Sequence, residues 1–299
     1  MSYVSVQRWS GREVRALRDA KRMSLREFAA HLGISDRMVS KWEAAGEQIH
    51  PRPVNQAALD TSLAQSSAEV RRRFEVLLAG DAAAIDTIHL TQPVRHPVDG
   101  KQMVLVEAGL FLQGPNNDPH WLPAFYLDVY PTTNADYARF IAATGHAAPQ
   151  GWTDGTYPAR LGNHPVVFVT WHDAAAYAEW SHKGLPTSAQ WEKAARGPLG
   201  KTYPWGTSAS AAKCNCRDNG PGETTAVDCY PSGTSPYGVY DLCGNVWEWT
   251  SHPSTPGRYE LKGGAFTSPF ARATPTAFND ASSKMLDDDT GFRCVAPEF

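Results

Sequence analysis

The stretch SPYGVYDLCGNVWEWT, residues 235–250, places two carboxylates, Asp241 and Glu248, on either side of a Gly-Asn turn. Such a turn presents carboxylate oxygens together with backbone carbonyls, a combination that suits a hard cation such as calcium. The alternative is a hydrogen-bonded turn in which both carboxylates accept backbone N–H groups. Trp247 and Trp249 follow the turn and are expected to add apolar area to a core.

The chain around this stretch, from Met103 onward, is dense in tryptophan and tyrosine and contains few convincing helices. Two amphipathic helices are expected, over residues 133–144 and 187–196, with Gly145 ending the first and Thr187 capping the second. Most of the tryptophans are expected to lie in the core. These features predict a large, loop-rich mixed domain in which helices cover a sheet. Its motifs occur in the order MVLVEAGLFLQG (103–114), PAFYLDVYPTTNADYARFIAATGH (123–146), HPVVFVTWHDAAAYAEW (164–180), GLPTSAQWEKAARG (184–197), YPWG (203–206), SPYGVYDLCGNVWEWT (235–250), LKGGAF (261–266) and GFRC (291–294).

Taken together, these motifs resemble the formylglycine-generating enzyme, or sulfatase-modifying-factor, family over residues 103–299. The resemblance implies an α+β fold that is low in regular structure, related to the C-type lectin fold, and often bound to structural calcium. Two calcium sites of the family map onto this sequence. The first set is Asp241, the carbonyls of Gly244 and Val246, and Glu248, and the second is Asn215, the Cys216 carbonyl, Asn219 and the Pro221 carbonyl.

The catalytic residues of the family are where the resemblance breaks. Its copper-dependent members need two thiolates after the Gly-Gly turn, because soft sulfur holds Cu(I). Here that segment reads GGAFTSPFARATPTAF, and the two sulfur positions fall at Ser268 and near Ala273. We therefore expect no bound copper and no catalytic residue there. The five cysteines, Cys214, Cys216, Cys229, Cys243 and Cys294, are expected to be buried or surface thiols rather than metal ligands.

A second oxidising branch of the family, the ergothioneine-type sulfoxide synthases, holds iron with three histidines. This chain has no H-x-x-x-H pair, and the histidines nearest one another in the large domain are His164, His172 and His182. A mononuclear iron site needs imidazole or carboxylate ligands that converge. We expect these three histidines to form structural hydrogen bonds instead.

A different pattern occupies the amino-terminal part, where SLREFAAHLGISDRMVSKWE spans residues 24–43. Ser24 and Glu27 have capping-box spacing, Gly33 is placed to end the first helix, and Ser35 is placed to cap the next. About residues 8–52 resemble the helix-turn-helix domain of the Xre family, whose second helix lies in the major groove of DNA. The alternative is a small helical bundle with a solvated basic face. The residues that the resemblance turns toward DNA are Ser35, Asp36, Arg37, Ser40 and Lys41.

Charge and composition divide the 299 residues in a similar way. Residues 1–80 carry 13 Lys and Arg against 9 Asp and Glu, although the whole chain has a net charge of -3. A cationic end suggests an anionic partner. We expect a helix-turn-helix domain over 1–80, a Pro- and Gly-containing linker over 81–102, and the large domain over 103–299. No apolar run approaches the roughly 18 residues that span a bilayer, and five cysteines without an export signal suggest reduced thiols in the cytoplasm.

These observations leave two classes of function open. The first is a DNA-binding regulator, either a monomer or a homodimer, whose large domain binds a peptide, a protein or a small molecule without copper oxidase activity. Its ligand groove would be lined by Trp247, Phe266, Phe270 and Arg272. The alternative is a metal-dependent oxidoreductase that acts on a cysteine or another thiol. A variant of the first class is a lectin-like recognition protein whose contact surface is formed by residues 265–290.

Overall fold

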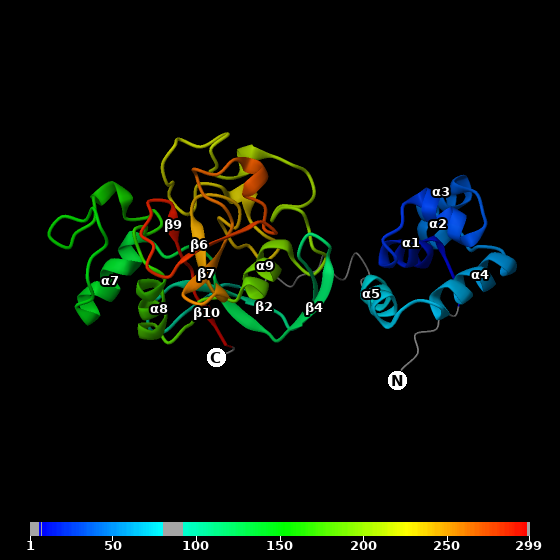
Figure 1. The fold of residues 1–299 in the computed structure, drawn as a ribbon, viewed down its shortest axis with the longest axis horizontal. Helices are drawn as coiled ribbons and strands as arrows, with labels where there is room; N and C mark the ends of the chain where they lie inside the picture. Colours follow the sequence, from blue (N-terminus) through cyan, green and yellow to red (C-terminus); the bar gives the residue numbers. More distant parts are fainter. Residues whose placement is uncertain (1–5, 7, 80–91, 298–299) are drawn as a thin grey trace. The chain divides into compact units, whose positions relative to one another are not determined.

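The computed structural model describes residue 6 and residues 8–79 and 92–297. The chain forms two compact units, Met1–Thr87 and Ile88–Phe299 (Figure 1), and each is described by itself. Of the linker expected over residues 81–102, residues 81–91 lie outside the described part of the chain.

The first unit is helical. Its elements are α1 (Gly11–Ala20), α2 (Leu25–Leu32), α3 (Asp36–Ala45), the 3₁₀ turn η1 (Gly46–Gln48), α4 (Pro53–Ala64) and α5 (Ala68–Ala79). Helix α1 packs against both α3 and α5. Val14, Leu17 and Ala20 form the apolar side of α1 and are fully buried. The core that these helices enclose contains Trp9, Val14, Leu17, Phe28, Val39, Trp42, Leu59, Leu63 and Phe74.

The ends of α2 confirm the expected pattern, whereas the start of α3 differs from it. Ser24 and Glu27 form a complete capping box, and Gly33 ends α2 in the left-handed conformation with φ 68°. Ser35 occupies the cap position of α3, but its side chain makes no capping hydrogen bond. The backbone N–H of Arg37 is instead bonded to the Asp36 carboxylate, at 2.8 Å. The capping role expected of the Ser35 hydroxyl is therefore wrong.

The second unit contains two four-stranded sheets and a hairpin in its described part. The first sheet has the order β1 (Val94–Arg95), β2 (Gln102–Val106), β5 (Phe125–Asp128) and β10 (Val295–Ala296), all antiparallel. The second has the order β8 (Phe278–Ser282), β7 (Arg258–Lys262), β6 (Trp247–Thr255) and β9 (Thr290–Gly291), with β9 parallel to β6. Strands β3 (Gly109–Gln113) and β4 (Asp118–Leu122) form the hairpin.

Three α-helices accompany these sheets in the described residues of this unit (Figure 1): α7 (Asn134–Thr144), α8 (Trp171–Trp180) and α9 (Ser188–Arg196). Helices α7 and α9 confirm the two expected helices. Thr133 and Thr187 form their capping boxes, and Gly145 ends α7 with φ 73°. Helix α8 was not expected, although Thr170 and Asp173 form a capping box at its start. The remaining helical pieces are the 3₁₀ turns η2 (Ala159–Leu161), η3 (Ala211–Lys213), η4 (Pro231–Gly233) and η5 (Phe270–Arg272).

Residues 94–102, which were assigned to the linker, belong to the fold of the second unit. Val94 pairs with Met103 across a hairpin, and the turn between the strands carries buried Asp99 and Lys101. Lys183 lies 2.8 Å from Asp99, so the turn is tied to the end of α8. Pro and Gly mark a hairpin turn as readily as a linker, which is why composition alone misplaced this boundary.

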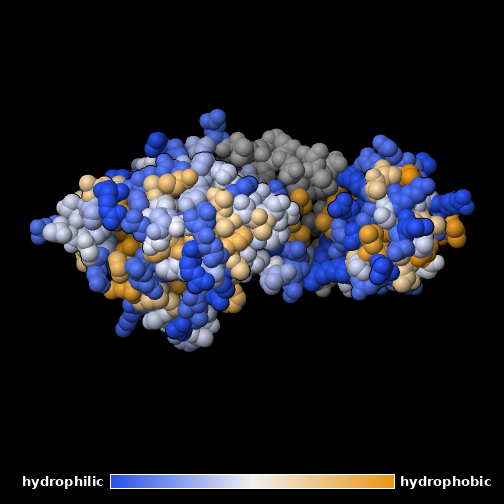
Figure 2. Space-filling model, turned by 90° about the horizontal axis from the view of Figure 1, so that it is seen from above, coloured by the Kyte–Doolittle hydropathy of each residue, from blue (hydrophilic) through white to orange (hydrophobic). Residues whose placement is uncertain are grey.

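The tryptophans are less uniformly buried than expected. Trp249 is fully buried, and Trp247 is 6% exposed, both in the largest core cluster. Trp152 and Trp171 are partly buried against that cluster, whereas Trp121 on β4 is 58% exposed. On the face seen in Figure 2, hydrophobic residues are scattered among hydrophilic ones. Among the described residues, no helix is both long enough and apolar enough to cross a bilayer.

Candidate functional site

Helix α3 presents one polar face to solvent. Its buried side consists of Val39 and Trp42, which pack into the helical core. Because these two residues fix the rotation of the helix, the opposite side is free for contact with a partner. The five residues expected to face DNA are all exposed: Ser35, Asp36, Arg37, Ser40 and Lys41.

A shallow hollow of about 600 Å³ lies beside this face. Arg37 and Lys41 line it from α3, and Arg52 and Asn55 line it from the start of α4. Sequence reasoning did not identify Arg52 or Asn55, because neither lies in the helix-turn-helix motif itself. Arg52 occupies the N-cap position of α4, directly before Pro53, and lines the hollow together with Arg37 and Lys41.

In the second unit, Glu248 at the start of β6 is fully buried and paired with Arg293. Both of its carboxylate oxygens are bonded to the Arg293 guanidinium at 2.7 Å, and one of them also accepts the Trp191 indole N–H at 2.7 Å. Arg293, the arginine of the GFRC motif, thereby supplies the positive charge that a buried carboxylate requires. Glu248 does not fit the role of a calcium ligand in this geometry.

Asp241 lies near this pair and has a weaker counter-charge. Its carboxylate accepts the side-chain N–H of Asn245 at 2.8 Å. Burial raises the pKa of Asp241 to about 7, although Asn245 and Arg293 act in the opposite direction. The Gly244 carbonyl also belongs to the first expected calcium set. It accepts the backbone N–H of Val246 at 3.0 Å. The first set is thus held together mainly by its own hydrogen bonds and by Arg293.

The second expected calcium set is only partly assembled. Asn215 is fully buried, and its side-chain oxygen has no hydrogen-bond partner, as a ligand atom would. The Cys216 carbonyl, in contrast, accepts the backbone N–H groups of Asn219 and Gly220. Asn219 and Pro221 are exposed. Asn215 therefore fits a cation, the remaining residues do not form a cage around it, and calcium at this loop stays a prediction.

Ser268 and Ala273 are the positions to which the sequence resemblance assigned the two sulfur ligands of copper-dependent enzymes. The Ser268 hydroxyl accepts the backbone N–H of Ala265 at 3.1 Å and so closes a local turn. Ala273 is fully buried. Its backbone lies so close to Gly264 that a Cβ added at Gly264 would come within 2.7 Å of the Ala273 Cα. Neither side chain offers sulfur, and the expectation that no copper binds at these positions stays a prediction.

Three other cysteines gather against Ala273, which sequence reasoning did not foresee. Cys214, Cys216 and Cys243 form one buried cluster with Ala273. The neighbouring Cys243 thiol and burial raise the pKa of the Cys214 thiol. The C-x-C spacing was the only signal of this cluster, because its third member comes from a distant loop.

An aromatic stack covers the three cysteines. The rings of Tyr203 and Trp205 are 5.2 Å apart and those of Tyr203 and Phe270 are 5.1 Å apart, and both pairs are nearly parallel. All three side chains are partly buried against the cysteine cluster. The Lys213 ammonium lies 5.8 Å from the centre of the Trp205 ring, a cation–π contact.

Only two of the four residues expected to line a ligand groove are accessible. Phe270 is half-buried and Arg272 is exposed. Trp247 and Phe266 are 6% and 8% exposed, and the Trp247 ring packs in the core. The accessible apolar surface at this place is therefore the aromatic stack, to which Phe270 belongs.

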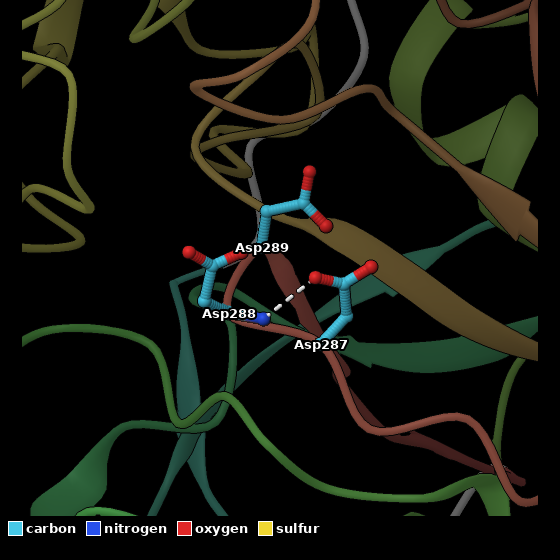
Figure 3. Close-up of side chains that lie close together, drawn as sticks. All are labelled: Asp287, Asp288 and Asp289. Carbon is cyan, nitrogen blue, oxygen red and sulfur yellow. Dashed lines mark hydrogen bonds between the residues drawn. The ribbon is translucent and has the colours of Figure 1, made fainter.

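Asp287, Asp288 and Asp289 bring three carboxylates together ahead of β9 (Figure 3). The backbone N–H of Asp288 is bonded to the Asp287 carboxylate at 2.8 Å, and Asp289 accepts the Thr267 hydroxyl. Among the described residues, no other group brings three possible metal-ligand atoms of His, Cys, Asp or Glu within 4.8 Å of one another. His164 and His172 are bonded to Thr224 and Ser283, and His182 follows α8.

Comparisons with known proteins identify the families to which the two units are similar. Residues 90–297 match the sulfatase-modifying factor enzyme 1-like domain, and residues 14–53 match the helix-turn-helix family. The chain therefore belongs to the sulfatase-modifying-factor family and carries in addition a helix-turn-helix unit of the kind that binds DNA. Both resemblances are confirmed, and so is the expected combination of a helical unit with an α+β domain of this family. The relation to the C-type lectin fold stays a prediction.

Among its relatives, the formylglycine-generating enzyme of Thermomonospora curvata is 34% identical over 224 residues, which cover 52% of this chain and 73% of that protein. The serine/threonine-protein kinase pkn1 of Chlamydia caviae is 35% identical over 172 residues, which cover 50% of this chain. The match covers 27% of that kinase, so this chain spans only about a quarter of its length. The solved structure of PvdO from Pseudomonas aeruginosa has a TM-score of 0.58 at 22% identity, covers 70% of this chain and all of that one, and shows the fold.

Proposed function

We propose that this protein is a DNA-binding regulator whose second unit binds a ligand and lacks copper oxidase activity. The observation that carries the first half is the face of α3, where Arg37 and Lys41 are exposed on the side opposite the buried Val39 and Trp42. A helix held by its apolar side in this way can enter a major groove with its polar side. The excess of Lys and Arg over residues 1–80 supports an anionic partner.

The two cations have different roles in this proposal. A guanidinium contacts guanine through two parallel hydrogen bonds, whereas an ammonium suits a phosphate as a point charge. Arg37, in the first turn of α3, is therefore assigned to base contact and Lys41, one turn later, to phosphate contact. Arg52, which lines the same hollow from α4, is assigned to the phosphate backbone.

Replacement of the family's thiols by Ser268 and Ala273 supports the second half of the proposal. Without two soft ligands at those positions, the copper chemistry of the relatives has no place to occur there. The exposed edge of the aromatic stack, with Arg272 and Lys213 near it, suits an extended peptide or a flat ligand. The alternative function, a metal-dependent oxidoreductase, is supported by no comparable set of contacts among the described residues.

The test of DNA binding uses fluorescence anisotropy of the full chain against genomic fragments at two salt concentrations. Arg37→Ala is expected to cost about 1–3 kcal/mol of specific binding, and Lys41→Ala is expected to lower the slope of log affinity against log salt by about 1. Lys284→Ala removes the same charge from an exposed position in the second unit and serves as the matched control. No binding at low salt, or equal losses in all three variants, would contradict the proposal.

The absence of oxidase activity is tested separately. The full chain, supplied with copper and oxygen, is incubated with a cysteine-containing peptide, and the peptide mass is followed. We expect the cysteine to remain unchanged. An aldehyde product at the cysteine would favour the oxidoreductase and would leave the DNA-binding result untouched.

A further inference from the structure

A hollow of about 360 Å³ lies in the second unit, where the hairpin of β1 and β2 meets the start of α7. Its lining includes the guanidinium groups of Arg95 and Arg139, the carboxylate of Asp228, the Tyr130 ring and Val227. None of these residues belongs to the aromatic stack or to the cysteine cluster. The volume lies at the lower end of the range usual for small-molecule sites, so a ligand of few atoms would fill it.

Both guanidinium groups are bound to the turn of the hairpin. Arg95, at the end of β1, donates to the Gly100 carbonyl at 3.1 Å, and Arg139 of α7 donates to the Asp99 carbonyl at 3.0 Å. Because these two carbonyls are consecutive along the chain, the hydrogen bonds bring the two cations to the same turn. Guanidinium groups suit a carboxylate, because they bind it through two parallel hydrogen bonds.

The two cations differ in their counter-charges. Arg139 is paired with Asp136 at 2.6 Å, so its charge is already balanced. No carboxylate of the described residues lies within 4.0 Å of the exposed Arg95 guanidinium. The hydrogen bond to the Gly100 carbonyl leaves most of the N–H donors of Arg95 for a ligand.

Asp228 contributes a negative charge to the same hollow. The Asn163 amide donates to its carboxylate at 3.0 Å, and the Val227 N–H donates to the Asn163 carbonyl at 3.0 Å. These two hydrogen bonds hold the segment in place. No cation of the part of the chain that the structure describes lies within 4.0 Å of the Asp228 carboxylate. Asp228 and Arg95 therefore line one hollow with opposite charges that are not paired with each other.

The apolar part of the lining is formed by Tyr130 and Val227. Tyr130 follows β5 and is half-buried, and its ring lies against that of Tyr240 with the ring centres 4.8 Å apart. Val227 is buried. An aliphatic or aromatic group placed on this part of the lining loses contact with water, which favours binding.

From this arrangement we propose that the hollow binds a free α-amino acid with an apolar side chain. Arg95 and Arg139 bind the ligand carboxylate, and Asp228 binds its ammonium group. Tyr130 and Val227 contact its side chain. A simple anion fits less well, because the Asp228 carboxylate would repel it. The inference goes beyond the proposed function and depends neither on DNA binding nor on the aromatic stack.

The experiment titrates L-leucine and L-phenylalanine into the full chain by isothermal titration calorimetry. Two analogues of leucine are compared with it: L-leucinamide keeps the ammonium group and lacks the carboxylate, and 4-methylpentanoate keeps the carboxylate and lacks the ammonium group. Each analogue is expected to bind at least about tenfold more weakly than leucine, because one charged group of the hollow is left without its hydrogen bond.

The analogues also separate the sources of such a ligand. If 4-methylpentanoate binds as tightly as leucine, the hollow is an anion site, and if leucinamide does, it is a site for the amino terminus of a peptide. Either result would overturn the proposal, and so would the absence of binding of both amino acids. These measurements use the unchanged chain, so they decide the question even where a variant fails to fold.

Two variants test the assigned contacts. Arg95→Ala is expected to weaken leucine binding by about tenfold or more and to leave that of leucinamide unchanged. Asp228→Asn should weaken leucine binding to a similar extent and should not weaken that of 4-methylpentanoate. Arg272→Ala and Asp288→Asn remove the same charges from exposed positions outside the hollow and should bind leucine as the unchanged chain does. A loss in Arg272→Ala equal to that in Arg95→Ala would place the ligand at the aromatic stack and contradict the assignment.

Discussion

Asp136 lies in the first turn of α7 with two cations against its carboxylate. The Lys101 ammonium is 3.2 Å away and the Arg139 guanidinium is 2.6 Å away. The carboxylate also accepts the Thr133 backbone N–H at 3.0 Å, which closes the capping box. Burial acts to raise the pKa of Asp136, but Lys101, Thr133 and Arg139 outweigh it and lower that pKa to about 2. One carboxylate thus joins the start of α7 to the turn between β1 and β2.

From this pKa we predict how Asp136→Asn changes stability with pH. A carboxylate whose pKa is lower in the folded chain stabilises the fold above its unfolded pKa, near 4, and loses that contribution as the pH falls toward 2. Asp136→Asn should therefore lower the free energy of unfolding by about 2 kcal/mol at pH 7. The gap should close between pH 4 and pH 2, as measured by urea unfolding at several pH values. Asp280→Asn removes an exposed, ion-paired carboxylate and should have little effect. A gap that stays constant down to pH 2 would contradict the argument.

At the scale of helices and strands, the sequence predicts elements well where their ends carry local chemistry. Helices α2, α7 and α9 begin at Ser or Thr caps, and Gly33 and Gly145 end two of them in the left-handed region. Other features depend on contacts that no local pattern announces. Examples are the hairpin of β1 and β2 and the ion pair of Arg293 with Glu248. The cysteine cluster was not predicted for the same reason, because no local sequence pattern places Cys243 beside Cys214.

Two serines in the helix-turn-helix unit offer a comparison at this scale. The Ser24 hydroxyl accepts the Glu27 backbone N–H at 3.3 Å at the start of α2, whereas the Ser35 hydroxyl caps nothing at the start of α3. Ser24→Ala is expected to cost about 1 kcal/mol of stability, because it leaves a helical N–H without its cap. Ser35→Ala should stay within about 0.5 kcal/mol, as exposed substitutions usually do. Chemical unfolding followed by circular dichroism compares the two, and equal losses would show that Ser35 caps α3 in solution.

At the scale of the whole molecule, each unit has a core of its own. Leu17, Phe28 and Trp42 belong to the cluster of the helical unit, and Trp249 and Phe292 belong to the largest cluster of the second unit. The two family matches, at residues 14–53 and 90–297, fall in different units. Composition and charge already separate the two parts in the sequence, because a segment with an excess of Lys and Arg is followed by one that is dense in tryptophan and tyrosine.

Two separate cores lead to the expectation that the full chain unfolds in two steps. Leu17 and Phe292 are both fully buried, one in each core. Leu17→Ala is expected to destabilise the helical unit by about 2–5 kcal/mol, and Phe292→Ala the second unit by about 3–5 kcal/mol, because each leaves a cavity. In differential scanning calorimetry, each variant should lower the temperature of one transition and leave the other in place. A single transition that moves in both variants would mean that the units unfold together. In that case a ligand bound by the second unit would change the stability of the DNA-binding helices directly.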